Sequence, residues 1–397
     1  MSNQNAVDRG KEVLVGNYGR YPVSFVSGSG CTLIDEEGKE YKDFLAGIAV
    51  CALGHCHSAV SKAIAEQASR LIHVSNLYYT EPATKLAELL VTNSFGDKVF
   101  FCNSGAEANE AALKLARIHS PAGRYSIISL AGSFHGRTMA TLAATGQPKF
   151  HEDFKPMPDG YSFVEFGDIA KLEAAVDETT CAIICEPLQG EGGVRPLDKE
   201  YVQAIRKFCD DKGLLLIFDE IQTGVGRTGT LFAYEQFGVE PDIMSLAKGL
   251  GSGMPIGAIV TRNEIAASFA PGTHGSTFGG NPVSCAAAIA TLELVLEENF
   301  IPEMNKVVSY LTGELKKLVE DFPKLFVGQR GLGLLQGLVT TEEGARVGTE
   351  IVNKMLDRGY LINFAGGVAL RFAPPLIVTE QECKGMLAVL REVLAEY

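Results

Sequence analysis

Lys248 is the residue whose type and position say most about chemistry. It follows the apolar stretch 243–247 and enters the glycine-rich run Gly-Leu-Gly-Ser-Gly. A lysine amine fixed beside tight turns condenses with an aldehyde when partial burial or a nearby cation lowers its pKa. Lys248 is therefore a candidate for forming a Schiff base.

Two other apolar runs end in residues with complementary chemistry. Asp219 and Glu220 follow residues 214–218, and Ser104-Gly105-Ala106 follows residues 99–102 at the start of a helical pattern. A carboxylate, an amine and the anion-binding start of a helix are what pyridoxal phosphate requires of a protein. Each segment also fits a simpler interpretation, a charged strand end or an ordinary helix cap, and the local sequence leaves both open.

Charged residues in apolar or glycine-rich surroundings add candidate substrate contacts. Arg371 is a lone charge in an apolar strand, and a buried arginine needs an anion, which Glu191 in the turn Gly-Glu-Gly-Gly can provide. A structural salt bridge explains the same pair equally well. Phe134 and Arg137 follow another strand, where they form either a plain turn or a stacking face and a carboxylate-binding fork.

Two further patterns carry less weight. Residues 224–229 match the G-x-G-x-x-G pattern of nicotinamide enzymes, but the following segment is short and aromatic and does not open a sizeable helix. His55-Cys56-His57 places three ligand types in consecutive positions, which rarely converge on one ion, so we expect no metal site.

The composition limits the partners that the protein can have. The net charge of -13 over 397 residues repels nucleic acid, and we find no basic run. The first residues are polar and the longest apolar stretch is interrupted by Glu293, so we expect no membrane span and a cytoplasmic protein. Nine cysteines without paired spacing are expected to be reduced thiols.

Apolar runs alternate with helical stretches through the middle of the chain. Runs of this kind predict an α/β fold with a mostly parallel sheet covered by helices on both faces. We expect six strands, at residues 99–102, 126–130, 181–185, 214–218, 243–246 and 256–260. Ligands bind at the carboxyl ends of such strands, where Gly105, Asp219 and Lys248 fall.

The remaining segments predict a second, smaller α+β domain. We place the large domain at residues 50–295 and form the small one from residues 1–49 and 296–397. Glycines around residues 32–35 predict hairpins in the first segment. Further predictions are a helix between Asp198 and Gly213, a helix from Asn281 through Glu298, another at 302–322, and Thr-x-x-Glu capping boxes at Thr340 and Thr379.

Taken together, several segments strongly resemble the class III pyridoxal-phosphate aminotransferases, and the resemblance spans nearly the whole chain. They are residues 104–109, 134–138, 186–191, 219–224, Lys248 and 276–282. Residues 44–50, 54–57 and 134–147 are most similar to the acetylornithine aminotransferase subfamily. The resemblance implies fold type I, pyridoxal 5'-phosphate as cofactor, and a homodimer with the active site at the subunit interface.

The resemblance also implies roles in cofactor binding. Lys248 forms the Schiff base, Asp219 pairs with the ring nitrogen, and Gln222 approaches the ring hydroxyl. Further contacts are implied for the two ring faces, by Phe134 and Ile221, and for the phosphate, by Ser104, Gly105 and Ala106, with Ser276 and Thr277 contributed by the other subunit.

For the substrate, the family pattern assigns Arg137 and Tyr18 to the distal carboxylate of an ω-amino acid. Arg371 takes the α-carboxylate of glutamate or 2-oxoglutarate, and Glu191 masks it in the other half-reaction. Ser276 is also among the implied substrate contacts. The implied reaction moves the terminal amine of N2-acetylornithine to 2-oxoglutarate in arginine biosynthesis. Ornithine, succinylornithine and succinyl-diaminopimelate remain alternatives, as does an aminomutase of the same fold.

Overall fold

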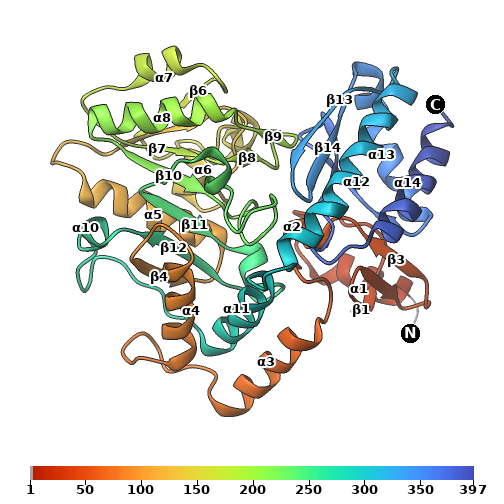
Figure 1. The fold of residues 1–397 in the computed structure, drawn as a ribbon, viewed down its shortest axis with the longest axis horizontal. Coiled ribbons are helices and arrows are strands. Elements are labelled where there is room, and N and C mark those ends of the chain that lie inside the picture. Colours follow the sequence, from red (N-terminus) through yellow and green to blue (C-terminus); the bar gives the residue numbers. More distant parts are fainter. Residues whose placement is uncertain (1–2) are drawn as a thin grey trace.

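A seven-stranded sheet forms the centre of the larger part of the molecule in the computed structural model, which describes residues 3–397 (Figure 1). Strand β12 is antiparallel to its neighbours and the others are parallel. In sheet order the strands are β4 (Lys98–Cys102), β12 (Gly257–Thr261), β11 (Ile243–Leu246), β10 (Leu215–Asp219), β7 (Thr180–Cys185), β5 (Ser126–Leu130) and β6 (Tyr161–Val164).

Helices cover both faces of this sheet, so the central strands β7, β10 and β11 are almost entirely buried and mostly apolar. Successive strand residues point to opposite faces. Ile217 therefore packs in one cluster with the apolar side of α5 (Gly105–His119), and its neighbour Phe218 packs in the other with α8 (Lys199–Lys212) and α11 (Pro282–Val295). The six predicted strands all form, with ends within one residue of the prediction, whereas β6 was not predicted.

A four-stranded antiparallel sheet and three long helices form the smaller part (Figure 1). The strands, in order, are β13 (Phe326–Leu332), β14 (Leu335–Thr340), β17 (Ala369–Phe372) and β16 (Asn363–Ala365). The helices are α12 (Phe300–Asp321), α13 (Glu342–Asp357) and α14 (Glu380–Leu394).

The predicted hairpins near the amino terminus form a third sheet. Antiparallel strands β1 (Phe25–Ser29), β2 (Thr32–Asp35) and β3 (Glu40–Asp43) are joined by β15 (Tyr360–Leu361), which pairs in parallel with β3. This pairing connects the amino-terminal segment to the carboxyl-terminal region. We retain the domain boundaries at residues 50 and 295 as a proposal.

Two of the predicted helix ends are confirmed and two differ from the prediction. Gly213 ends α8 in the left-handed conformation as predicted, and Thr379 forms the predicted capping box with Glu382. The capping box at Thr340 is wrong, because the backbone of Thr340 belongs to β14 and Thr341 caps α13 instead. The helix expected through Glu298 ends at Val295.

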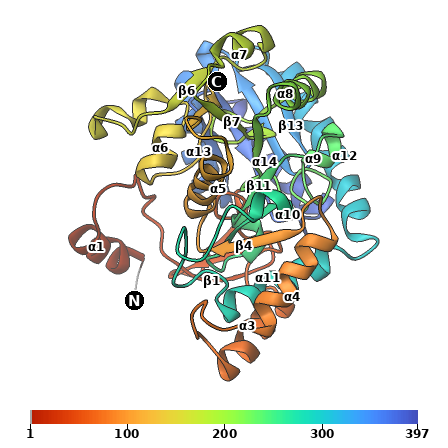
Figure 2. The same cartoon turned by 90° about the vertical axis from the view of Figure 1, so that its left-hand side faces the viewer.

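Shorter elements complete the chain, and α1 lies apart from the body of the molecule (Figure 2). They are α1 (Asn3–Val13), α2 (Ala46–Ala49), α3 (Ser58–Arg70), α4 (Glu81–Thr92), α6 (Met139–Ala144), α7 (Ile169–Ala175), α9 (Tyr234–Phe237), α10 (Asn263–Ala266), β8 (Leu188–Gln189), β9 (Arg195–Pro196) and 3-10 turns at Pro148–Phe150, Glu152–Phe154 and Lys248–Gly251. Within residues 3–397, no helix has both the length and the apolarity needed to cross a bilayer.

Candidate active site

A cavity of about 440 Å³ lies where the strands of the central sheet end. The loops that follow β4, β5, β7, β10 and β11 all contribute to its wall. The predicted site residues in this wall are Ser104, Gly105, Ala106, Phe134, Arg137, Glu191, Asp219, Ile221, Gln222 and Lys248. Residues that the sequence places at separate strand ends are thus brought together around one space.

Lys248 lies at the end of the strand next to that of Asp219. Strands β10 and β11 pair in parallel, with Asp219 opposite Ser245. Lys248 then begins a 3-10 turn with a φ of 41°, a conformation that is strained for a residue with a side chain. Burial lowers the pKa of its amine, and Arg371 acts in the same direction, whereas Glu191 and Asp219 oppose it. A neutral amine is the form that attacks a carbonyl.

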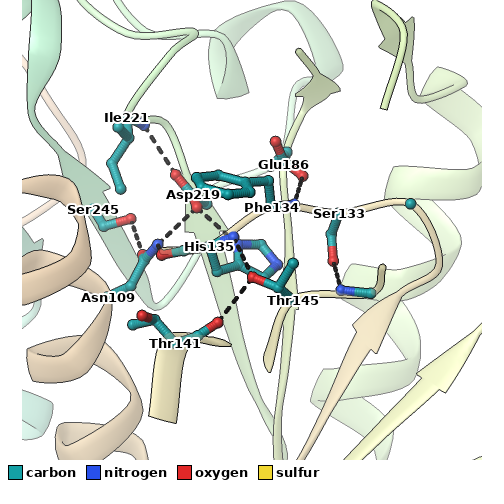
Figure 3. A network of polar contacts seen from close by, with 12 residues as sticks. Asn109, Ser133, Phe134, His135, Thr141, Thr145, Glu186, Asp219, Ile221 and Ser245 are labelled. Atoms are coloured by element: carbon teal, nitrogen blue, oxygen red, sulfur yellow. Dashed lines mark hydrogen bonds and ion pairs between the residues drawn. The ribbon is translucent and has the colours of Figure 1, made fainter. Parts of the chain in front are cut away.

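Asp219 is held by donors from three parts of the fold (Figure 3). Its Oδ2 accepts hydrogen bonds from Asn109 Nδ2 at 2.8 Å and from His135 Nδ1 at 2.7 Å. Its Oδ1 accepts one from the backbone N–H of Ile221 at 3.1 Å. Because the side chain is buried, these bonds both orient the carboxylate and stabilise its charge.

Asn109 and His135 are themselves fixed by further bonds. Asn109 Oδ1 accepts from the hydroxyl of Ser245 at 2.7 Å, and its Nδ2 also donates to the carbonyl of His135. The backbone N–H of His135 donates to Thr145 at 3.0 Å. We assign the ring proton to Nδ1, because the carboxylate can only accept and Nε2 is buried with no partner among the described residues.

Asn109, His135 and Ser245 belong to the site but were not predicted from the sequence. A signal was nevertheless present for two of them. Asn109 is the polar residue within the buried face of an alanine-rich helix, and Ser245 interrupts an apolar strand. Buried polar side chains in such surroundings need partners, although the sequence does not say which.

The start of α5 is the candidate anion-binding site. Ser104 is the N-cap, and its hydroxyl accepts from the N–H of Glu107 at 3.2 Å. The first amides of a helix have no partner within the helix. A Cβ on Gly105 would lie 2.8 Å from Ile221 Cδ1, so only glycine leaves the space beside these amides free.

Arg137 lies in the cavity wall against aromatic rings. Its guanidinium is 5.4 Å from the ring centre of Phe134 and 4.1 Å from that of Phe150. Such stacking leaves the N–H groups in the guanidinium plane free to bind a carboxylate. Among the ion pairs found within residues 3–397, none involves Arg137.

Arg371 is paired with Glu191, as the sequence analysis anticipated. The side chain of Arg371 is 1% exposed, and its Nη1 lies 2.5 Å from Glu191 Oε1. Burial alone would raise the pKa of Glu191, but the guanidinium lowers it below its usual value. Arg371 also donates from Nη2 to Asn363 at 3.2 Å and from Nη1 to Gln222 Oε1 at 3.4 Å, so two partners remain if Glu191 moves away.

Besides Arg371, which lies behind the wall, three predicted residues lie outside the cavity of the single chain. Tyr18 is 68% exposed and packs against Arg20 in the segment between α1 and β1. Ser276 accepts a hydrogen bond from Asn103 at 3.1 Å without lining the cavity, and Thr277 does not line it either. Their proposed roles therefore require a second subunit or a movement of the chain.

The weaker candidates are structural. Glu220 is buried away from the cavity, where it accepts from the N–H groups of Ala233 and Tyr234; burial raises its pKa to about 7. Glu220 is thus neither a second carboxylate beside Asp219 in the cavity nor a charged strand end exposed to solvent. Residues 224–229 form turns instead of opening a helix. His55 binds Asp43 at 2.8 Å.

In the described part of the chain, no cluster of three or more metal-ligating side chains is found. The donor set fits pyridoxal phosphate instead. It provides an amine of lowered pKa, a fixed carboxylate for a ring nitrogen, and a helix start that a glycine keeps open for the phosphate.

Comparison with known proteins agrees with this arrangement. The family model of class III aminotransferases matches residues 15–394. An acetylornithine aminotransferase of Methanocaldococcus jannaschii is 48% identical over 404 residues, covering 100% of this chain and 99% of the relative.

Solved structures show the same fold. The ornithine aminotransferase of Toxoplasma gondii has a TM-score of 0.94 at 31% identity, covering 100% of this chain and 96% of the other. The N-acetylornithine aminotransferase of Stenotrophomonas maltophilia has a TM-score of 0.85 at 35% identity, covering 98% of each chain.

Proposed function

Because the chain belongs to the class III aminotransferases, we propose that it moves the terminal amine of N2-acetylornithine to 2-oxoglutarate, giving N-acetylglutamate semialdehyde and glutamate. One structural observation carries this proposal. Two arginines suited to carboxylates lie at the cavity that holds Lys248: Arg137 is in its wall without an ion-pair partner, and Arg371 lies behind the wall, where Glu191 masks it. Two such cations suit a pair of substrates that both carry carboxylates but differ in length.

The enzyme uses pyridoxal phosphate, which supplies an aldehyde that binds amines covalently and a ring that withdraws electrons from the bound carbon. Lys248 is the proposed attachment point. Asp219 would keep the ring nitrogen protonated and Gln222 would approach the ring hydroxyl. The proposed contacts of the ring faces and phosphate are Phe134, Ile221, Ser104, Gly105 and Ala106.

Lys248 also provides the proton transfer. With the cofactor bound, the Lys248 amine, whose pKa burial lowers, would accept the proton from the substrate carbon and donate it back at the carbon that becomes protonated. Bound pyridoxal phosphate would supply the carrier for the amine between the two half-reactions, and the pocket would bind the two carbonyl acids in turn. We therefore expect ping-pong kinetics.

Each of the two arginines would bind a carboxylate of a different substrate. Arg137, together with Tyr18, would bind the distal carboxylate of the amine donor, which brings its terminal amine to Lys248. Arg371 would bind the α-carboxylate of glutamate or 2-oxoglutarate once Glu191 has turned away. The loop of Glu191 permits such a turn because glycines flank it on both sides.

We also propose a homodimer, in which Ser276 and Thr277 of one subunit reach the phosphate of the other. Large apolar side chains are exposed near these residues: Ile72, Leu77, Tyr78, Tyr79 and Phe278, of which Tyr79 is 100% exposed. Exposed apolar patches of this kind mark interfaces.

Sedimentation should therefore give twice the monomer mass, and a monomer with full activity would contradict the proposal.

The cysteines support a reducing location. All nine are free, and seven of them are buried. Because disulfides form in secretory compartments and are rare in the cytosol, we retain the cytoplasm as the proposed location.

The amine donor is tested by comparing kcat/KM for N2-acetylornithine, ornithine, succinylornithine and succinyl-diaminopimelate, with 2-oxoglutarate as acceptor. We expect acetylornithine to exceed ornithine by about tenfold or more, since a pocket for a neutral amide disfavours a charged amine. A higher value for any other donor would replace acetylornithine as the substrate. Product formation without 2-oxoglutarate would indicate an aminomutase.

Glu191→Gln tests the masking of Arg371. The variant leaves Arg371 without a neutralising charge, so kcat/KM for acetylornithine should fall about tenfold relative to that for glutamate. The matched control is Glu173→Gln, at an exposed position on α7. An unchanged ratio of the two values in Glu191→Gln would rule out the masking role.

A further inference from the structure

Glu186 is a buried acid in the cavity wall to which the preceding account gives no role. It is the first residue after β7, and Cys185 before it pairs with Phe218 of β10. Glu186 and Asp219 are therefore side by side at the ends of neighbouring strands (Figure 3). The residue is 6% exposed and lines the same cavity as Lys248.

The carboxyl of Glu186 has fewer donors than the other acids of this region. Its Oε2 accepts from the backbone N–H of Phe134 at 3.1 Å. Within residues 3–397 this is its one hydrogen bond, and it forms no ion pair. By contrast, Asp219 has three donors and Glu191 has a guanidinium. A carboxylate in this position would lack compensation for its lost hydration.

The charges that face Glu186 also disfavour its ionised form. Burial raises its pKa well above the usual value, and the negative charges of Asp219 and Glu191 raise it further. The N–H of Phe134 and the amine of Lys248 act in the opposite direction. Burial lowers the pKa of Lys248 itself, which shifts that amine toward its uncharged form.

We propose that Glu186 is a neutral carboxylic acid in the working enzyme and donates a hydrogen bond from Oε1 to the ring oxygen of the cofactor. Oε2 already accepts from Phe134, so the proton belongs on Oε1. The ring nitrogen needs an anion, which Asp219 supplies, whereas the neighbouring ring oxygen carries negative charge and needs donors. A second carboxylate would repel it, and a neutral acid can bind it.

This proposal rests on the cofactor and not on the choice of amine donor. It would stand if ornithine replaced acetylornithine as the substrate. It also makes Glu186 a contact of the cofactor, additional to Gln222, at the same ring oxygen.

The protonation state is tested by infrared difference spectroscopy of the holoenzyme, wild type minus Glu186→Gln. The measurement is made at about pH 9, where Glu220, with a pKa of about 7, is ionised. We expect a protonated-carboxyl stretching band in the wild type that the variant lacks. Glu220→Gln is the control and should leave this band in place. Absence of the band from the wild type would overturn the proposal.

The target of the hydrogen bond is tested by affinity. Apoenzyme with Glu186→Ala should bind pyridoxal phosphate about tenfold more weakly than wild type, the effect expected for one lost hydrogen bond to a charged oxygen. Glu186→Gln keeps a neutral donor and should lie within about threefold of wild type. The analogue that lacks the ring hydroxyl should bind all three proteins equally. Equal losses for both ligands in Glu186→Ala would overturn the assignment to the ring oxygen.

Discussion

The buried carboxylate of Asp219 is the constraint on which the rest of the site depends. A carboxylate away from water takes up a proton unless donors stabilise its charge, and a protonated Asp219 could not hold a ring nitrogen as a cation. Its donors come from helix α5, from the loop after β5 and from its own turn. These segments must pack within hydrogen-bond distance, so the position of α5 on the sheet is part of the chemistry. The same helix presents its first amides to the phosphate.

Three carboxyl groups in the wall of this cavity have different surroundings and are therefore stabilised to different extents. Asp219 has three donors, Glu191 has Arg371, and Glu186 has a single backbone amide. Burial raises the pKa of Glu186 well above its usual value, whereas Arg371 lowers that of Glu191. Lys248 lies between these charges with a lowered pKa. One small region therefore brings together a carboxylate with three donors, a masked cation, an amine of lowered pKa and, as we propose, a neutral acid, which together match the separate parts of one cofactor.

Much of this site could be predicted from the sequence, because apolar runs that end in polar residues mark strand ends, and parallel strand ends meet at one edge. Arg371 and Glu191 could be paired for a similarly simple reason, since a buried guanidinium needs an anion. The partners of Asp219 could not be predicted. His135 lies 84 residues away and Asn109 lies 110 residues away, and only the packing of α5 and the β5 loop brings them together. The predicted helix cap at Thr340 was wrong because two threonines are adjacent there. Thr340 pairs within strand β14, and Thr341 caps α13.

The central claim is that one lysine amine carries the cofactor, and reduction with borohydride tests it most directly. Treating the holoenzyme with borohydride, digesting it and mapping the peptides by mass should locate a stable pyridoxyl adduct on Lys248. We expect the adduct on Lys248 because its amine lines the same cavity as Asp219 and the start of α5. An adduct on another lysine, or none after full reduction, would contradict the account.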